Sequence, residues 1–307
     1  MNSRFVVVFG SINMDLVAQV PRLPKPGETL LGSRFSTVPG GKGANQAVGV
    51  ARLNTPTQMI ARVGDDAFGQ ELIAGLQAAG VDVAGVSVDR TTASGVAMIA
   101  VDEESENHII VVPGANGTVG TIEINQLRST LATASALLLQ LEIPLHTVQA
   151  AAEIAHAAGV RVILDPAPAQ ANLPDTLYAA VDILTPNATE AEHLIGRSIH
   201  SRSEAEQAAQ MLRQRGAKTV IVKLGAEGAV CATEEDCFFV PAFSVNAIDT
   251  VAAGDAFNAG LTVALIEGKS LREAVRWGAA AGALAATKSG AQASLSDRAT
   301  FDAFLEH

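Results

Sequence analysis

The run from residue 249 to residue 260 carries the residue types of a phosphoryl-transfer site. It reads Asp-Thr-Val-Ala-Ala-Gly-Asp-Ala-Phe-Asn-Ala-Gly, with small residues between two acids and an apolar helical pattern after them. This order predicts a turn that opens into a helix N-terminus, where unpaired N–H groups and the helix dipole favour an anion. A carboxylate beside such a site is useful if it accepts a proton from an alcohol that attacks the bound phosphoryl group. We therefore expect Asp255 to be a general base, and the alternative is an acid that merely favours the helix dipole. The amides of the expected anion site are those of Ala252, Ala253 and Gly254.

A second cluster, residues 38–47, reads Val-Pro-Gly-Gly-Lys-Gly-Ala-Asn-Gln-Ala. Its glycines permit positive φ and a close approach of the backbone to a ligand, while Lys42 and Asn45 add a cation and an amide at a helix start. A Walker A loop needs Ser or Thr after the lysine, but Gly43 follows it here, so we reject a P-loop. The segment 10–13, Gly-Ser-Ile-Asn, likewise fails the dinucleotide-binding pattern.

Other polar residues stand where predicted strands end. Asn13 and Asp15 follow the first apolar run, Glu142 follows another, and Asn187 follows a third. Ligands of open α/β sheets bind outside the carboxyl ends of the strands. Amides and carboxylates gathered there suit a polyhydroxyl ligand. Asn187 can also be read as a helix N-cap, because Thr189 and Glu190 follow it.

The elements that must position these residues alternate between apolar strand-like runs and helical patterns. This alternation predicts an α/β fold with a Rossmann-like, mostly parallel sheet flanked by helices. The expected strands are 5–10, 58–63, 136–141, 160–165, 182–185 and 219–224. The expected helices are 44–53, 67–79, 122–132, 144–158, 189–195 and 204–215.

Two segments do not fit this alternation. Residues 16–38 hold three prolines among alternating residues, and residues 95–112 read as two strands around a polar turn at 102–107. We expect them to pair as a small β-sheet that acts as a lid on one domain of residues 1–307; the alternative is edge elaboration without a role. The C-terminal third predicts an antiparallel hairpin over 229–243 and three helices starting at Asp255, Leu271 and Asp297.

Composition narrows the partners. The 307 residues carry a net charge of −11, which argues against a surface that tracks DNA or RNA phosphates. No apolar run is long enough to span a membrane or to act as a secretion signal. The chain has only two cysteines and no Cys-x-x-Cys motif, so we do not expect a structural zinc. The low cysteine content leads us to expect a cytoplasmic setting.

Five stretches of the chain together resemble the ribokinase-like (PfkB) carbohydrate kinase family. The matching stretches are 10–15, 40–47, 187–190, 249–255 and 290–292, so the resemblance spans the whole chain. It implies a Rossmann-like domain with a β-sheet lid that transfers the γ-phosphate of ATP to the 5-hydroxyl of ribose. The lids of such kinases pair with one another, so the resemblance also implies a homodimer.

The resemblance also implies a role for each matching position. Asp255 would be the base and the 252–254 amides the anion hole. Ribose would be held by Asn13, Asp15, Gly41, Lys42, Asn45, Glu142 and Asp255. ATP would lie along Asn187, Lys223, Gly225, Gly228 and Gly254. Asn187 and Glu190 would order Mg²⁺ through its water. A potassium site would be built from Asp249, Val251, Ala285, Lys288, Gly290 and Ser294.

The chain departs from the family pattern at Lys223 and Ala279, near the expected nucleotide, and at Ala188 inside the Asn-x-x-Glu motif. Lys223 either reaches a phosphate or is an exposed strand end, and Ala279 puts the nucleotide preference in doubt. Two other functions remain open. The first is another sugar or nucleoside kinase of the family, especially a deoxyribokinase, and the second is a catalytically inactive sugar sensor. An intact Asp255 argues against the sensor.

Overall fold

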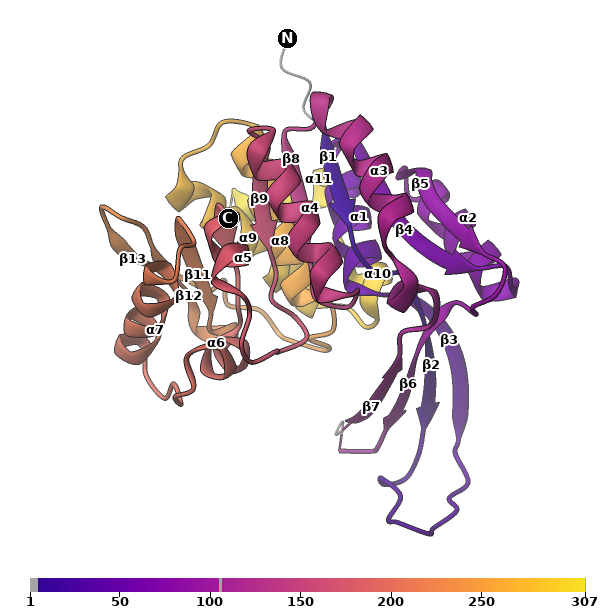
Figure 1. The fold of residues 1–307 in the computed structure, drawn as a ribbon. Helices are drawn as coiled ribbons and strands as arrows, with labels where there is room; N and C mark the ends of the chain where they lie inside the picture. Colours follow the sequence, from indigo (N-terminus) through magenta and orange to yellow (C-terminus); the bar gives the residue numbers. More distant parts are fainter. Residues whose placement is uncertain (1–4, 105–106, 307) are drawn as a thin grey trace.

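A nine-stranded sheet runs through the computed structural model, which describes residues 5–104 and 107–306 (Figure 1). The strand order is β13-β12-β11-β10-β9-β8-β1-β4-β5. Neighbours from β11 to β5 pair in parallel, whereas β12 and β13 pair antiparallel at one edge. The strands are β1 (Val6–Phe9), β4 (Thr57–Gly64), β5 (Asp82–Asp89), β8 (Ala136–Leu139), β9 (Arg161–Leu164), β10 (Ile183–Leu184), β11 (Thr219–Lys223), β12 (Gly228–Ala232) and β13 (Cys237–Pro241).

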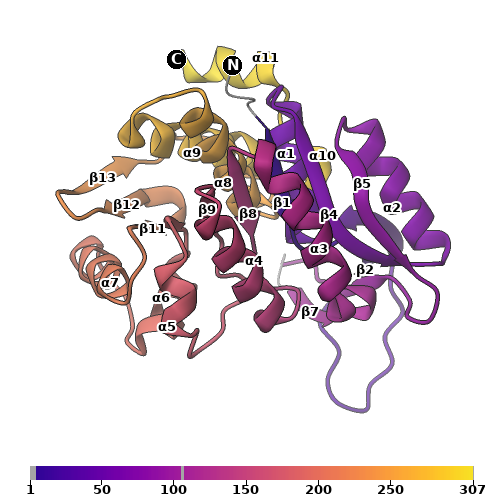
Figure 2. The same cartoon turned by 45° about the horizontal axis from the view of Figure 1, so that its top comes forward.

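Helices cover both faces of this sheet because its strands are apolar on both sides (Figures 1 and 2). Val6 and Val8 of β1 belong to the core under one helical layer, and Val7 and Phe9 to the core under the other. The first layer holds α1 (Lys42–Arg52), α2 (Ala67–Ala78), α8 (Ala253–Ile266) and α9 (Leu271–Ala286). The second holds α3 (Thr121–Thr130), α4 (Leu145–Ala157), α5 (Asp175–Ala179), α6 (Ala188–Ile195) and α7 (Arg202–Gln214). The short α10 (Ala291–Ser294) packs against α1 and α9, and α11 (Arg298–Leu305) against α9.

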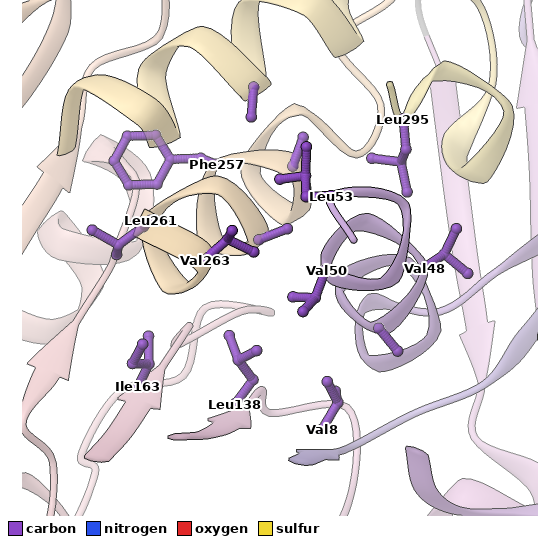
Figure 3. Packing of buried hydrophobic residues seen from close by; sticks show 14 of the residues in the cluster. Val8, Val48, Val50, Leu53, Leu138, Ile163, Phe257, Leu261, Val263 and Leu295 are labelled. Atoms are coloured by element: carbon purple, nitrogen blue, oxygen red, sulfur yellow. The ribbon is translucent and has the colours of Figure 1, made fainter. Parts of the chain in front are cut away.

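The packing of α1 and α8 on the sheet fixes where the site can form. Val8, Leu138 and Ile163 point from three neighbouring strands toward these two helices (Figure 3). Val50 and Val263 face them from α1 and α8 (Figure 3). The N-terminal turns of the two helices lie together, because Asn45 of α1 bonds to Asp255 of α8. They lie at the edge where the strands have their carboxyl ends, because Gln46 of α1 bonds to Asp165 directly after β9.

A separate four-stranded sheet extends from one side of the molecule (Figure 1). Its order is β3-β2-β6-β7, with β2 and β6 parallel and the outer pairs antiparallel. The strands are β2 (Asn13–Gln19), β3 (Arg34–Gly40), β6 (Gly95–Val101) and β7 (Asn107–Val112). This small sheet therefore starts at Asn13 and includes Gly40, so that it joins the main sheet at two of the predicted site segments. Residues 105–106 of the expected polar turn lie outside the described residues.

The expected α/β class is confirmed. All six predicted strands and all six predicted helices are present, with ends that differ by at most two residues. The hairpin β12–β13 is present as well. Three elements were not predicted: β5, α5 and α10. Within the described part of the chain, none of the helices is both long enough and apolar enough to cross a membrane.

Candidate active site

The turn before α8 has the backbone shape that the sequence predicts for an anion site. Ala252 caps the helix in the left-handed conformation, with φ 60° and ψ 7°. The Asp249 carboxylate fixes the approach to this turn by accepting from the Val251 amide at 3.0 Å and the Gly290 amide at 2.9 Å. The next residues, Ala253 and Gly254, begin the helix and line a large cavity. Their amides are in the first turn, where a helix leaves N–H groups without intrahelical partners.

Asp255 lies one residue further along α8 and is 4% exposed. Its Oδ2 accepts from the side-chain Nδ2 of Asn45 at 2.9 Å, and its Oδ1 accepts from the side-chain Nε2 of Gln46 at 3.0 Å. Burial raises the pKa of Asp255 to about 6, with the charge of Asp165 acting in the same direction and Lys42 acting against it. A carboxylate with this pKa is ionised at neutral pH and is a better proton acceptor than an exposed aspartate.

The start of α1 is tied to the carboxyl end of β8. Glu142 Oε2 accepts from the Lys42 amide at 3.0 Å and from the Ser11 hydroxyl at 2.5 Å. Gly41 caps α1 with φ 89°, and a Cβ there would lie 2.7 Å from the Asn13 amide nitrogen. The glycine is therefore needed both for its positive φ and for the close approach of the two segments.

Asn13 and Asp15 are carried by the first strand of the small sheet. Asn13 Oδ1 accepts from Asn116 Nδ2 at 2.7 Å, and the Asn116 side chain also bonds to the backbone N–H and carbonyl of Ile12. Burial raises the pKa of Asp15 to about 7, and the charges of Glu142 and Asp255 add to this rise. Asp15 is thus near enough to the other two carboxylates to be affected by their charge.

A cavity of about 690 Å³ lies beside Asp255, which forms part of its lining. Its lining includes Asp255, Lys42, Lys223 and Ala279. The predicted nucleotide residues Asn187, Gly225, Gly228 and Gly254 all line this cavity. Of the predicted sugar residues, Lys42 and Asp255 line the same cavity, and Asn45 bonds to Asp255.

Lys42 is the cation at this junction. Burial alone would lower its pKa, but the carboxylates around it raise it above the ordinary value, so the ammonium stays charged. These carboxylates are Asp255, Asp165, Glu142 and Glu190. One partly buried lysine thus partly balances acids that come from four different segments of the chain.

Asn187 and Glu190 form a reciprocal capping box at the start of α6. Glu190 Oε2 accepts from the backbone N–H of Asn187 at 2.7 Å, and Asn187 Oδ1 accepts from the backbone N–H of Glu190 at 2.8 Å. The N-cap alternative for Asn187 is therefore confirmed, while both residues also line the cavity. Burial raises the pKa of Glu190, and the charge of Asp165 raises it further.

Of the predicted potassium residues, Asp249 and Val251 are in the loop that precedes α8, and Gly290 bonds to Asp249. Asp249 is joined to Gly290, as described above, and the Asp249 amide donates to Ala286 at 3.2 Å. The buried Ser294 hydroxyl donates to the Ala291 carbonyl at 2.7 Å. Among the described residues, no group of three or more His, Cys, Asp or Glu side chains is placed to hold a metal ion directly.

The sequence reasoning missed four polar residues that support the site: Ser11, Gln46, Asn116 and Asp165. Ser11 and Gln46 were inside the quoted motifs but received no role. Asp165 was visible as the acid that ends a predicted strand, in the same way as the residues that were selected. Asn116 had no signal, because it follows the small sheet and reaches Asn13 only in the folded chain.

A sheet covered by helices on both faces, with a buried carboxylate and a helix N-terminus at the strand ends, is the arrangement that a phosphotransferase of the α/β class would need. The model of the pfkB family of carbohydrate kinases matches residues 3–298. The chain belongs to this family, as the motifs indicated.

Individual relatives agree with the family. A ribokinase of Haemophilus influenzae is 42% identical over 302 residues, which is 98% of each chain. A deoxyribokinase of Salmonella typhi is 35% identical over 98% of each chain. Among solved structures, an Arabidopsis thaliana ribokinase complexed with ribose and ATP superposes with a TM-score of 0.91 at 34% identity, covering all of both chains.

Proposed function

We propose that the protein transfers the γ-phosphoryl group of ATP to the 5-hydroxyl of D-ribose, giving ribose 5-phosphate. The observation that carries this proposal is the position of Asp255. It is buried, lines a cavity large enough for a nucleotide, and lies in the first turn of α8, directly after Ala252, Ala253 and Gly254, which line the same cavity. Asp255 takes the proton of the sugar hydroxyl, and the amides of Ala252, Ala253 and Gly254 stabilise charge on the transferred group. The names of the relatives point to the same reaction.

The sugar occupies the side of Asp255 that faces the small sheet. Its hydroxyls are bound by Asn13, Asp15, Gly41, Lys42, Asn45 and Glu142. Three observations support this: the Asn45 side chain donates to Asp255, Glu142 accepts from the Lys42 backbone amide, and the charges of Glu142 and Asp255 raise the pKa of Asp15. Polar groups held this rigidly discriminate well between a hydroxyl and its absence.

The nucleotide occupies the cavity, along Asn187, Lys223, Gly225, Gly228 and Gly254. Lys223 is 12% exposed at its side chain and its ammonium points toward Gly254, where an added Cβ would lie 3.4 Å from Nζ. This favours the phosphate-contacting interpretation of Lys223 over an exposed strand end. Ala279 lines the same cavity with a methyl group, so base recognition falls to other residues.

Magnesium fits the acidic end of the cavity. Glu190 offers a carboxylate whose pKa is raised by burial and by the charge of Asp165, and few direct protein ligands are needed because Mg²⁺ keeps much of its water. Glu190, with Asn187, would hold the ion through water, and the ion supplies charge neutralisation for the phosphates.

A monovalent cation, K⁺, fits the region behind the anion turn. The donors would be oxygens of Asp249, Val251, Ala285, Lys288, Gly290 and Ser294, most of them backbone carbonyls. Asp249 already links the loop before the turn to Gly290. Its position supports a role of the ion in orienting the amides at 252–254.

The small sheet acts as a lid and as the contact of a homodimer in the cytoplasm. Residues from Ile109 to Val112 are exposed along the edge strand β7, with Ile110 at 60%. Phe35 and Met98 add exposed apolar surface on the same sheet. An unpaired apolar edge of this kind is usually covered by a partner, and a second copy of the chain would cover it.

A deoxyribokinase is the second candidate, because one relative of this name matches the whole chain. ADP formation measured with D-ribose, deoxyribose and fructose, each in potassium and in sodium, tests the proposal. We expect the highest kcat/KM with ribose and faster turnover in potassium. Equal kcat/KM for ribose and deoxyribose would refute the choice of substrate, equal rates in both salts would refute the cation site, and no sugar-dependent ADP would support the inactive sensor.

A further inference from the structure

A chain of four polar side chains, three of them buried and Lys223 partly buried, connects the predicted nucleotide side of the site with the predicted base. Lys223 Nζ donates to Asp165 Oδ1 at 3.0 Å. Gln46 Nε2 donates both to Asp165 Oδ2 at 3.1 Å and to Asp255 Oδ1 at 3.0 Å. The two oxygens of Asp165 therefore bond to different partners, one on each side of the site.

We propose that Asp165 is a positioning residue that holds the Lys223 ammonium toward the nucleotide phosphates and, through Gln46, fixes the carboxylate of Asp255. This inference rests on the proposed function, because it assigns the cavity to ATP. It adds two residues, Asp165 and Gln46, to the machinery of the reaction. It also gives Lys223 a defined geometry.

The first half of the proposal concerns Lys223. This residue ends β11, and its side chain reaches past the end of β10 to Asp165, which follows β9. Among the described residues, Asp165 is the hydrogen-bond acceptor of this ammonium, so two of its three N–H groups remain for a ligand. The same ammonium faces Gly254 at the anion turn. An ammonium held from behind in this way meets a phosphoryl group without first losing side-chain freedom.

The second half concerns Gln46. Its carbonyl oxygen accepts from the Gln140 amide at 2.7 Å, which sets which end of the side chain faces the carboxylates. The amide is then left to bridge Asp165 and Asp255, both of which are almost fully buried. Gln46 thus restricts the Asp255 carboxylate on the Oδ1 side, while Asn45 restricts it on the Oδ2 side.

The other charges around this chain do not replace either link. Lys42 lowers the pKa values of Asp255 and Glu190, and the charge of Lys223 also lowers that of Glu190, but no hydrogen bond joins Lys42 Nζ or Glu190 to Asp165 among the described residues. Asp165 is therefore the shared partner of the two functional groups, and changes to it should affect both.

Steady-state kinetics on four variants separate the links. Lys223→Met should raise the KM for ATP about 10- to 100-fold and leave the KM for ribose unchanged, because a charged hydrogen bond to phosphate is lost. Gln46→Met should lower kcat on the order of 10-fold with an unchanged KM for ATP. Asp165→Asn should do both. The double variant Asp165→Asn/Lys223→Met should have the KM for ATP of Lys223→Met alone, since the two residues act on the nucleotide as one unit.

The matched control is Lys218→Met, which breaks a lysine–aspartate pair with Asp182 on the surface, 2.7 Å long and with the lysine 62% exposed. It should change none of these constants. Should Asp165→Asn alone fail to fold, because it leaves a buried charge unpaired, the double variant still compares with Lys223→Met. An unchanged KM for ATP in Lys223→Met, or a further rise in the double variant, would overturn the proposal.

ATP binding measured by calorimetry without sugar keeps this result apart from the function itself. If the wild type binds ATP but turns over no sugar, the proposed function fails while the Lys223 link can still be read from the binding constants. If the wild type is active and the variants bind ATP like the wild type, only the positioning role fails.

Discussion

The side-chain amide of Asn45 donates to the Asp255 carboxylate over 2.9 Å, although the two residues are 210 positions apart in the chain. Each lies in the first turns of its helix, α1 and α8 respectively. Because these helices pack side by side on β1, β8 and β9, the glycine-rich segment and the anion turn form one site (Figure 3). The predicted base is therefore held by the predicted sugar-binding segment.

Replacing Asp255 by asparagine should remove the proton acceptor and keep the shape of the site. We expect turnover to fall by about 10²- to 10⁴-fold, the usual contribution of a positioned general base, while ribose binding is retained. Turnover is measured by ADP release and ribose binding by calorimetry. Asp65→Asn, an exposed aspartate outside the cavity lining, is the control and should be unaffected. Near-normal turnover in Asp255→Asn would remove this residue from the role of base.

Gly41→Ala should damage both stability and sugar binding. The added Cβ would sit at φ 89° and 2.7 Å from the Asn13 amide nitrogen, so the backbone must move. We expect a loss of more than about 1 kcal/mol in unfolding free energy and a higher KM for ribose. Denaturant unfolding and sugar titration measure the two effects.

Gly75→Ala in α2 is the matched control for Gly41→Ala. No heavy atom lies within 4 Å of the position of its added Cβ, so it should gain about 0.5–1 kcal/mol and leave the KM unchanged. If Gly41→Ala behaved like this control, the close approach of the two segments would not matter for the sugar.

Asp15 should destabilise the sugar-free protein at neutral pH. Its pKa is about 7 in the folded chain against 3.8 for the ordinary group, because burial and two nearby carboxylates favour the neutral form. Between pH 4 and 7 the folded state keeps a proton that the unfolded chain has lost, so wild-type stability falls as the pH rises through this window. Asp15→Asn removes this loss.

The difference in unfolding free energy between Asp15→Asn and the wild type should therefore grow by up to about 4 kcal/mol between pH 4 and 8. Denaturant titrations without sugar measure it. Asp297→Asn is a control of opposite sign, because N–H donors at the start of α11 lower the pKa of that carboxyl. A pH-independent difference for Asp15→Asn would show that Asp15 is ionised without penalty.

Ile110→Lys should separate the expected homodimer into monomers. It places a charge in the exposed apolar edge strand of the small sheet. Light scattering on the eluting protein measures the mass. Ile122→Lys is the control, since Ile122 is exposed to a similar degree, 58%, on α3 of the main body. A wild type that elutes as a monomer, or an unchanged dimer in Ile110→Lys, would contradict a contact through this strand.

Local patterns were sufficient to predict the main sheet, because strands buried on both faces are continuous apolar runs such as β1 and β8. β5 was missed because it is an edge strand whose apolar pattern is short: Gly85 interrupts it, and an aspartate stands at each end. α5 and α10 were missed because helices of five and four residues show no helical period.

The site was predictable where a residue type has a chemical meaning by itself. Asp255 and Lys42 were selected on that basis, and the structure places both at one junction. Gln46 and Asp165 were not selected, because their roles depend on which partners the fold brings to them. Asn116 depends entirely on the position of the small sheet beside Asn13.

A crystal structure with D-ribose and a non-hydrolysable ATP analogue is the most direct test of Asp255 as the acceptor of the hydroxyl proton. The 5-hydroxyl oxygen should lie about 2.6–3.2 Å from the Asp255 carboxylate, with the terminal phosphate at the amides of residues 252–254. A complex in which a different side chain contacts that hydroxyl, or in which the terminal phosphate lies away from this turn, would contradict the mechanism.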